Sequence, residues 1–255
     1  MNCIACELVK NTHINEEFFI LQFVWEAPAP KAGQFFMLKP VRSAVFLPRP
    51  ISIFEYNKDQ KTVKFLVSKC GKGTEELYYL QPGTSVLLTG PFGNAWEDFL
   101  PEKGKVALVG GSAGIAPFAA LVAEKPWYDF HFFAGFREGF REKEQEDTIM
   151  GAAKNAKKIV ITAEDGRNAL IGRVVDFIFE PKSYDMILGC GPSAMLKALI
   201  KKCETENVTC YISTENRFAC GVGACLGCTI NTVHGNRRCC KDGPIFSSKE
   251  VIFND

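Results

Sequence analysis

The stretch FACGVGACLGC, from Phe218 to Cys228, decides how the C-terminal part of this chain can fold. It holds three of the chain's eleven cysteines, and Cys239 and Cys240 follow soon after it. The region from about Glu215 onward is rich in glycine and cysteine and is too short for an apolar core of its own. We therefore expect something other than hydrophobic burial to hold this region together.

Cys220, Cys225 and Cys228 have the spacing C-x4-C-x2-C. Plant-type ferredoxins bind a two-iron, two-sulfur cluster with this spacing and a later fourth cysteine. The alternative is a structural zinc site of four thiolates, whose usual signature is two closely spaced pairs. The spacing favours the 2Fe-2S cluster and leaves Cys239 or Cys240 as the fourth ligand. Glycines between the cysteines allow the backbone to wrap closely and to turn its amides toward the sulfurs.

The other cysteines and the composition limit the class of protein. The chain has 255 residues, 47% of them hydrophobic, and a formal net charge of +1, which predicts two compact units and no broad attraction to nucleic acid or anionic membrane. The first residues lack the pattern of a secretory signal, so we expect a cytoplasmic protein with reduced thiols. The isolated cysteines are expected to be small buried hydrophobes: Cys3, Cys6, Cys70, Cys203 and Cys210.

Residues 1–100 predict an antiparallel β-barrel. Short runs rich in β-branched and aromatic residues alternate with turn residues, as in FFILQFVW, GQFFMLKP, RPISIFEY, KTVKFLVSK and TSVLLTGP. Residues 101–214 predict a parallel sheet flanked by helices, because KVALVG, DFHFFAG, KKIVIT, YDMILGC and VTCYIST alternate with helix-length segments. The apolar stretch from Val106 to Ala123 contains glycines and a proline, so no membrane span is expected there.

Two glycine turns in the second region predict a nicotinamide dinucleotide site. GGSAGIAPF follows an expected strand and contains Gly110, Gly111 and Gly114, and GCGPSAM contains Cys190, Gly191 and Pro192. Such turns bring a pyrophosphate close to the start of a helix. Arg137 is either a contact to the adenosine ribose or its 2′-phosphate, or a surface arginine. Cys190, at the end of a strand, is either a nicotinamide contact or a buried thiol.

Two motifs in the barrel offer the groups that a flavin dinucleotide needs. RPIS spans Arg49 to Ser52, and GKGT spans Gly71 to Thr74. Together they supply a cation, a rigid proline turn, hydroxyls and glycine-exposed amides. Taken alone, these motifs fit an ordinary strand and turn equally well.

The order of all these motifs resembles the ferredoxin reductase superfamily, and within it the electron-transfer subunits of class B, NAD-dependent dihydroorotate dehydrogenases. The resemblance covers essentially the whole chain, and ENRFACGVGACLGC with CCKDGPIF is its most specific part. It implies an FAD-binding barrel (1–100), an NAD-binding α/β domain (101–214) and a 2Fe-2S segment (215–255). It also implies flavin contacts at Arg49, Pro50, Ile51, Ser52, Leu66, Val67, Ser68, Gly73 and Thr74, and cluster ligands at Cys220, Cys225, Cys228 and Cys240.

The resemblance also implies a mechanism in pyrimidine biosynthesis. Dihydroorotate would be oxidised at FMN in a separate catalytic subunit, and electrons would pass singly through the cluster to FAD and then as a hydride to NAD+. Ser52 would hydrogen-bond flavin N5. The surface around Cys220 to Cys228 would meet the partner, in a heterotetramer with two copies of each subunit.

Two other interpretations remain at this point. One is a related flavin and iron–sulfur subunit with a different partner, such as that of a ferredoxin:NADP oxidoreductase or a sulfide dehydrogenase, and Arg137 keeps NADP open. The other is a zinc-stabilised binding module that catalyses nothing. The number and spacing of the cysteines favour the dihydroorotate dehydrogenase subunit.

Overall fold

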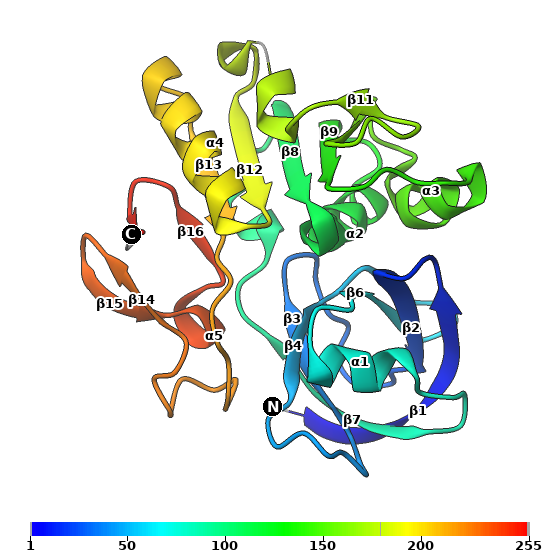
Figure 1. Ribbon diagram of the computed structural model, residues 1–255. Coiled ribbons are helices and arrows are strands. Elements are labelled where there is room, and N and C mark those ends of the chain that lie inside the picture. The colour runs from blue at the N-terminus through cyan, green and yellow to red at the C-terminus, as the bar shows by residue number, and fades with distance from the viewer. Residues whose placement is uncertain (1, 179, 254–255) are drawn as a thin grey trace.

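The computed structural model describes residues 2–178 and 180–253. Within these residues two seven-stranded sheets form separate lobes, and a three-stranded sheet lies beside both (Figure 1). The predicted multi-domain fold, with a barrel, a parallel sheet and a C-terminal segment, is confirmed.

The first sheet is antiparallel throughout and has the order β4-β3-β7-β1-β2-β6-β5. Its two outermost strands are joined by only Ile53 and Phe54, so the sheet curls into a barrel. Its strands and the helix after β6 are β1 (Asn2–His13), β2 (Phe18–Val24), β3 (Phe35–Pro40), β4 (Arg49–Ser52), β5 (Glu55–Asn57), β6 (Thr62–Ser68), α1 (Lys72–Tyr78) and β7 (Ser85–Phe92).

Two details of the barrel differ from the sequence analysis. Strand β1 was not among the predicted runs, because only Cys6 and Leu8 of its twelve residues are buried and the rest is largely polar. The run RPISIFEY is two strands rather than one, because Ile53 and Phe54 turn into the core and interrupt it.

The second sheet has the order β11-β10-β9-β8-β12-β13-β16, and only the last pair is antiparallel. All five strands expected from the sequence are present. Its elements are β8 (Lys105–Gly111), α2 (Ala116–Glu124), β9 (Asp129–Phe136), α3 (Lys143–Met150), β10 (Lys158–Ala163), β11 (Leu170–Ile171), β12 (Met186–Cys190), α4 (Ser193–Glu206), β13 (Cys210–Ser213) and β16 (Ile245–Ser247). Short 3-10 helices are η1 (Trp96–Asp98), η2 (Ser112–Ile115), η3 (Gly151–Ala153), η4 (Val174–Phe177) and η5 (Pro181–Ser183).

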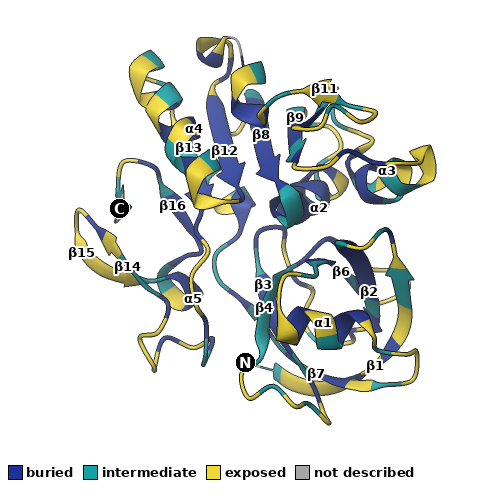
Figure 2. Ribbon diagram, viewed as in Figure 1, coloured by how far each residue is buried: buried dark blue, intermediate teal, exposed yellow. Residues whose placement is uncertain are grey.

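Side chains of this sheet alternate between two cores, because successive residues of a strand point to opposite faces. Val106 and Leu108 of β8 pack in the core that contains α2, whereas Ala107 and Val109 pack in the core that contains α4. The central strands β8 and β12 are therefore buried on both faces, as Figure 2 shows in dark blue. Their carboxyl ends point toward the barrel, which places both glycine turns between the two lobes.

The C-terminal segment is held in part by burial against the barrel, a contribution that the sequence analysis did not include. Phe218 packs on Phe35 with ring centroids 5.0 Å apart, and Phe246 and Cys239 belong to the same buried cluster. The segment contains β14 (Thr229–Thr232), β15 (Gly235–Arg238), α5 (Cys239–Asp242) and β17 (Val251–Ile252). It also supplies β16 to the second sheet.

The isolated cysteines behave as expected at three of five positions. Cys6, Cys203 and Cys210 are buried, but Cys3 and Cys70 are exposed. Cys3 lies near the start of β1, and Cys70 lines two cavities described below. In the described part of the chain no helix is long and apolar enough to cross a membrane.

Candidate flavin, nucleotide and iron–sulfur sites

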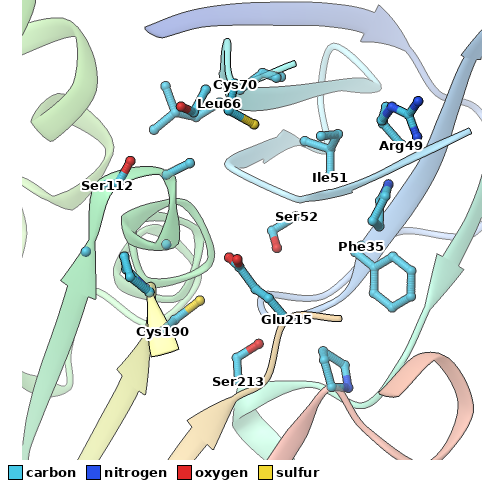
Figure 3. A pocket seen from close by; sticks show the side chains of 18 of the residues that line it. Phe35, Arg49, Ile51, Ser52, Leu66, Cys70, Ser112, Cys190, Ser213 and Glu215 are labelled. Carbon is cyan, nitrogen blue, oxygen red and sulfur yellow. The ribbon is translucent and has the colours of Figure 1, made fainter. Parts of the chain in front are cut away.

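A cavity of about 410 Å³ lies where the barrel, the parallel sheet and the C-terminal segment meet (Figure 3). It brings together most of the predicted cofactor residues, which come from strands and turns far apart in the sequence. Those that line it are Arg49, Pro50, Ile51, Ser52, Leu66, Val67, Ser68, Thr74, Gly111, Gly114, Cys190 and Pro192. We call this space the first cavity.

Three predicted residues do not line the first cavity: Gly73, Gly110 and Gly191. Gly73 supports it indirectly, because a β-carbon at this position would lie 1.8 Å from Nε of Arg49. Glycine therefore lets the Arg49 guanidinium lie against the loop. Gly110 and Gly191 are direct neighbours of the lining residues Gly111, Cys190 and Pro192.

The GKGT loop is closed by Thr74. Its Oγ1 accepts hydrogen bonds from the amides of Cys70 (2.9 Å) and Gly71 (3.2 Å) and donates one to the carbonyl of Gly71 (3.0 Å). This tight loop stands beside the Arg49 cation at one end of the first cavity. A cation next to a glycine-rich loop suits a pyrophosphate.

At the other end, Ser52, Cys190 and Glu215 point into the cavity from three different parts of the chain (Figure 3). Glu215 was missed by the sequence analysis. It follows β13, and the rule that ligands bind at the carboxyl ends of parallel strands could have found it. Burial raises the pKa of Glu215. Burial and the nearby Glu215 carboxyl together raise the pKa of the Cys190 thiol, which therefore stays protonated.

A second cavity of about 620 Å³ continues from the first along the carboxyl ends of the parallel strands. The two cavities share Ser68, Cys70, Gly111, Ser112 and Pro192. Arg137 lines the second cavity, together with Glu164, Arg173 and Asp176. The last two form an ion pair at 3.2 Å. Both glycine turns border this space, so its position and size suit a dinucleotide that reaches the first cavity.

Three of the four predicted ligands lie in residues 218–228, which we call the cysteine loop, and the fourth, Cys240, lies on α5. They form two pairs. The thiol of Cys220 interacts with that of Cys225, and the thiol of Cys228 with that of Cys240. Backbone amides point at the sulfurs: those of Val222 and Cys225 lie 3.4 Å from Sγ of Cys220, and that of Cys240 lies 3.5 Å from Sγ of Cys228. Cys239 is fully buried, and its Sγ lies 3.2 Å from Oγ1 of Thr214.

This arrangement fits a two-iron cluster better than zinc. Each iron of a 2Fe-2S cluster takes two cysteines, whereas zinc needs four ligands around one point. Two thiol pairs with amides directed at the sulfurs match the donors that a cluster requires. The choice of Cys240 over Cys239 as the fourth ligand stays a prediction.

Residues 215–252 match the family described as the iron–sulfur cluster binding domain of dihydroorotate dehydrogenase B. Curated relatives match nearly the whole chain. The electron transfer subunit of dihydroorotate dehydrogenase B (NAD(+)) from Clostridium acetobutylicum is 41% identical over 88% of this chain and 87% of its own length. That from Caldanaerobacter subterraneus is 33% identical over 98% of both. This chain belongs to the dihydroorotate dehydrogenase B electron-transfer subunits.

Solved structures share the fold of this dihydroorotate dehydrogenase B family member. A structure of NADH-dependent reduced ferredoxin-NADP oxidoreductase superposes with a TM-score of 0.82, at 23% identity over 98% of this chain and 90% of that one. A ferredoxin NADP+ reductase from Neisseria gonorrhoeae gives a TM-score of 0.68 at 18% identity, covering 85% of this chain and 95% of its own. At these identities the likeness concerns the fold alone.

Membership in the dihydroorotate dehydrogenase B family confirms the predicted oxidoreductase class and the role as an electron-transfer subunit. The predicted cofactors, FAD, a 2Fe-2S cluster and NAD, agree with this membership. An electron-transfer subunit implies a catalytic partner. The individual site residues and the domain boundaries at residues 100 and 214 stay predictions.

Proposed function

We propose that this chain carries electrons from an FMN-containing dihydroorotate dehydrogenase catalytic subunit to NAD+, with FAD in the first cavity and the dinucleotide in the second. The observation that supports this best is the first cavity, because one space gathers the flavin motifs of the barrel, the glycine turn of the parallel sheet and the segment that carries the cysteines. When bound, the cluster exchanges single electrons and FAD exchanges either single electrons or a hydride.

Each group of residues has a role in this proposal. Arg49 and the GKGT loop hold the flavin pyrophosphate, while Ile51 and Leu66 to Ser68 form the wall beside the ring. Ser52 supplies a hydroxyl to the reactive edge of the ring. Cys190 remains a neutral thiol at the end of β12, where a nicotinamide would approach from the second cavity.

The cysteine loop is coupled to the first cavity by direct contacts. Phe218 lines the cavity two residues before Cys220, and Thr214 lines it while contacting Cys239. Phe35 lines the cavity and packs against Phe218. The cluster ligands and the flavin site are therefore parts of one packed unit, as electron transfer between them requires.

The partner surface is proposed to surround Cys220 to Cys228. Leu226 is 61% exposed and Val222 39% exposed, and both lie between the cluster ligands. Exposed apolar side chains in such a place suit a contact with another protein. Two copies of each subunit in the complex, and a cytoplasmic location, stay predictions from the sequence.

The test is to purify the tagged chain anaerobically with its bound partner, add dihydroorotate and NAD+, and follow NADH by its near-ultraviolet absorbance. We expect NADH to form, and NADP+ to give a much slower rate. A complex that holds flavin and iron but forms no NADH would indicate a different dehydrogenase partner. Cys225→Ser should abolish electron transfer from the partner while NADH still reduces FAD, and normal transfer by that variant would contradict the route through the cluster.

A further inference from the structure

The carboxylate of Glu17 joins the two main lobes at the boundary between the cavities. Glu17 lies in the turn between β1 and β2 of the barrel. Its Oε1 accepts hydrogen bonds from Oγ of Ser68, at the end of β6, and from Oγ of Ser112, directly after β8, each at 3.3 Å. One carboxylate oxygen thus bridges the flavin-binding barrel and the parallel sheet.

The backbone of Glu17 is fixed, while its side-chain bonds are long. Oδ1 of Asn15 accepts hydrogen bonds from the amides of Glu17 (2.9 Å) and Phe18 (2.7 Å), and the carbonyl of Glu17 accepts one from the amide of Lys69 (2.7 Å). Bonds between oxygens are ordinarily 2.5 to about 3.0 Å, so the two at 3.3 Å are weak. The backbone of Glu17 is therefore held in place, while its carboxylate can exchange the two serine hydroxyls for a ligand.

Ser112 adds an independent sign of a functional position. Its φ is +53°, in the left-handed region that residues with a β-carbon avoid. Such strain is concentrated where a ligand is bound. Ser68 and Ser112 line both cavities, and Glu17 lines the second. These three side chains therefore border the opening through which a group must pass from the second cavity to the first.

The charges around this opening leave the Glu17 carboxylate available. The neighbouring cation, Lys69, lies 3.6 Å from the carboxylate of Glu16 and 4.2 Å from the ring centroid of Tyr78. The other charged residues that line the second cavity are Arg137, Glu164, Arg173 and Asp176, and the last two are paired with each other.

We propose that Glu17, with Ser68 and Ser112, recognises the nicotinamide end of the dinucleotide and favours its oxidised form. This inference rests on the proposed function, because it takes the second cavity as the dinucleotide site. The nicotinamide is the end that must reach the flavin, so it is the part that meets these residues. Its ring is cationic in NAD+ and becomes neutral when a hydride with its two electrons adds to it. A carboxylate at the opening therefore attracts the substrate NAD+ more than the product NADH.

The carboxamide of the nicotinamide suits the same three groups. Its amino group is a donor that the Glu17 carboxylate can accept, and its carbonyl is an acceptor for a serine hydroxyl. The bonds that Glu17 now makes to Ser68 and Ser112 would be exchanged for these. Glu17 would thus act as a specificity residue for the redox state of the ligand.

The test measures equilibrium binding rather than turnover, using the full chain loaded with FAD and cluster. Calorimetry with NAD+ and with 1,4,5,6-tetrahydro-NAD, a neutral analogue that cannot donate a hydride, gives two dissociation constants. For Glu17→Gln we expect NAD+ to bind about three- to tenfold more weakly and the neutral analogue to change by less than about twofold. Glu17→Asp, which keeps the charge, should retain the preference for NAD+.

Glu7→Gln is the matched control, because it removes the same charge from an exposed side chain of β1 that lines neither cavity. It should leave both dissociation constants unchanged. An equal change for both ligands in Glu17→Gln, or the same effect in Glu7→Gln, would overturn the role of Glu17 while leaving the dinucleotide site intact. Failure of the unmodified chain to bind either ligand would overturn the dinucleotide site itself, and this inference with it.

Discussion

The thiol of Cys190 and the carboxyl group of Glu215 face each other across the first cavity, one from the end of β12 and the other from the segment after β13 (Figure 3). Burial raises the pKa of both groups, and the Glu215 carboxyl raises that of the Cys190 thiol further, because a second negative charge nearby is repelled. The pair therefore presents a neutral thiol toward the space in which the flavin and nicotinamide are proposed to meet.

The first prediction concerns the reactivity of Cys190. Only the thiolate form of a cysteine is nucleophilic, and burial raises the pKa of the Cys190 thiol. Cys190 should therefore react with iodoacetamide at least about a hundredfold more slowly than the exposed Cys70. Mass spectrometry of peptides after timed alkylation measures both rates in one sample. Equal rates would show that Cys190 is an accessible thiolate. Glu215→Gln should speed Cys190 alkylation slightly and leave Cys70 unchanged.

The second prediction concerns the pH dependence of stability. The carboxyl of Glu124, on α2, accepts a hydrogen bond from the amide of Ala32 in the barrel at 2.9 Å, and burial raises its pKa from 4.5 to about 7. The folded state thus binds the proton of Glu124 more tightly than the unfolded chain does. The stability that this proton binding contributes is present below pH 4.5 and is lost as the pH rises through 7. Between pH 5 and 8 the chain should lose about 2 kcal/mol of unfolding free energy relative to Glu124→Gln.

Urea denaturation at a series of pH values measures this difference. Glu97→Gln is a control of opposite sign, because hydrogen bonds from Lys31 and Lys125 lower the pKa of Glu97. The stability that Glu97 contributes is present above pH 4.5 and is lost as the pH falls through its folded pKa. Parallel curves for the unmodified chain and Glu124→Gln would contradict the prediction.

The third prediction concerns the loop beside Arg49. Alanine at Gly73 would place its β-carbon 1.8 Å from Nε of Arg49 and push the guanidinium away from the first cavity. We expect FAD to bind about tenfold more weakly to Gly73→Ala, because a charge-assisted contact to the pyrophosphate is lost. Gly71→Ala is the matched control in the same loop, since nothing lies within 4 Å of the added carbon. Flavin fluorescence titration distinguishes the two, and equal affinities would refute the role of Arg49.

How much of the site the sequence predicts depends on how local its residues are. Arg49 to Ser52 and Leu66 to Ser68 belong to continuous motifs, and the structure brings these residues together in the first cavity. Glu215 and Glu17 belong to no flavin- or nucleotide-binding motif of the sequence. Glu215 could have been found only from its place after a parallel strand, and Glu17 reaches the second cavity through the packing of the lobes. The sequence does not predict strand β1 either, because few of its residues are buried and it forms by pairing with β2 and β7.

The fourth prediction separates the two adjacent cysteines of α5. Cys240 interacts with Cys228, whereas the thiol of Cys239 contacts the hydroxyl of Thr214. Cys240→Ser should therefore lose the visible absorbance of the oxidised cluster and the paramagnetic signal of the reduced cluster. Cys239→Ser should retain about two irons per chain. Iron analysis and electron paramagnetic resonance check both, and the reverse result would make Cys239 the fourth ligand.

The last prediction concerns Leu226, which stands between Cys225 and Gly227 with φ at +61°. This conformation is unfavourable for leucine, and the 61% exposed side chain gains little burial within its own chain. A contact with the catalytic partner would explain why an apolar side chain is found at this exposed position. Leu226→Gly removes the side chain and suits the backbone, so the cluster should remain while affinity for the partner falls about tenfold.

Val233→Ala is the matched control, because Val233 is 59% exposed at the turn between β14 and β15, away from the cluster ligands. Surface plasmon resonance against the immobilised catalytic subunit compares the two variants, and the visible spectrum of each reports whether its cluster is intact. Unchanged affinity in a Leu226→Gly chain with a full cluster would mean that the partner binds elsewhere. An equal loss in both variants would mean that the interface extends over the whole three-stranded sheet, and Leu226 would then have no special part in docking.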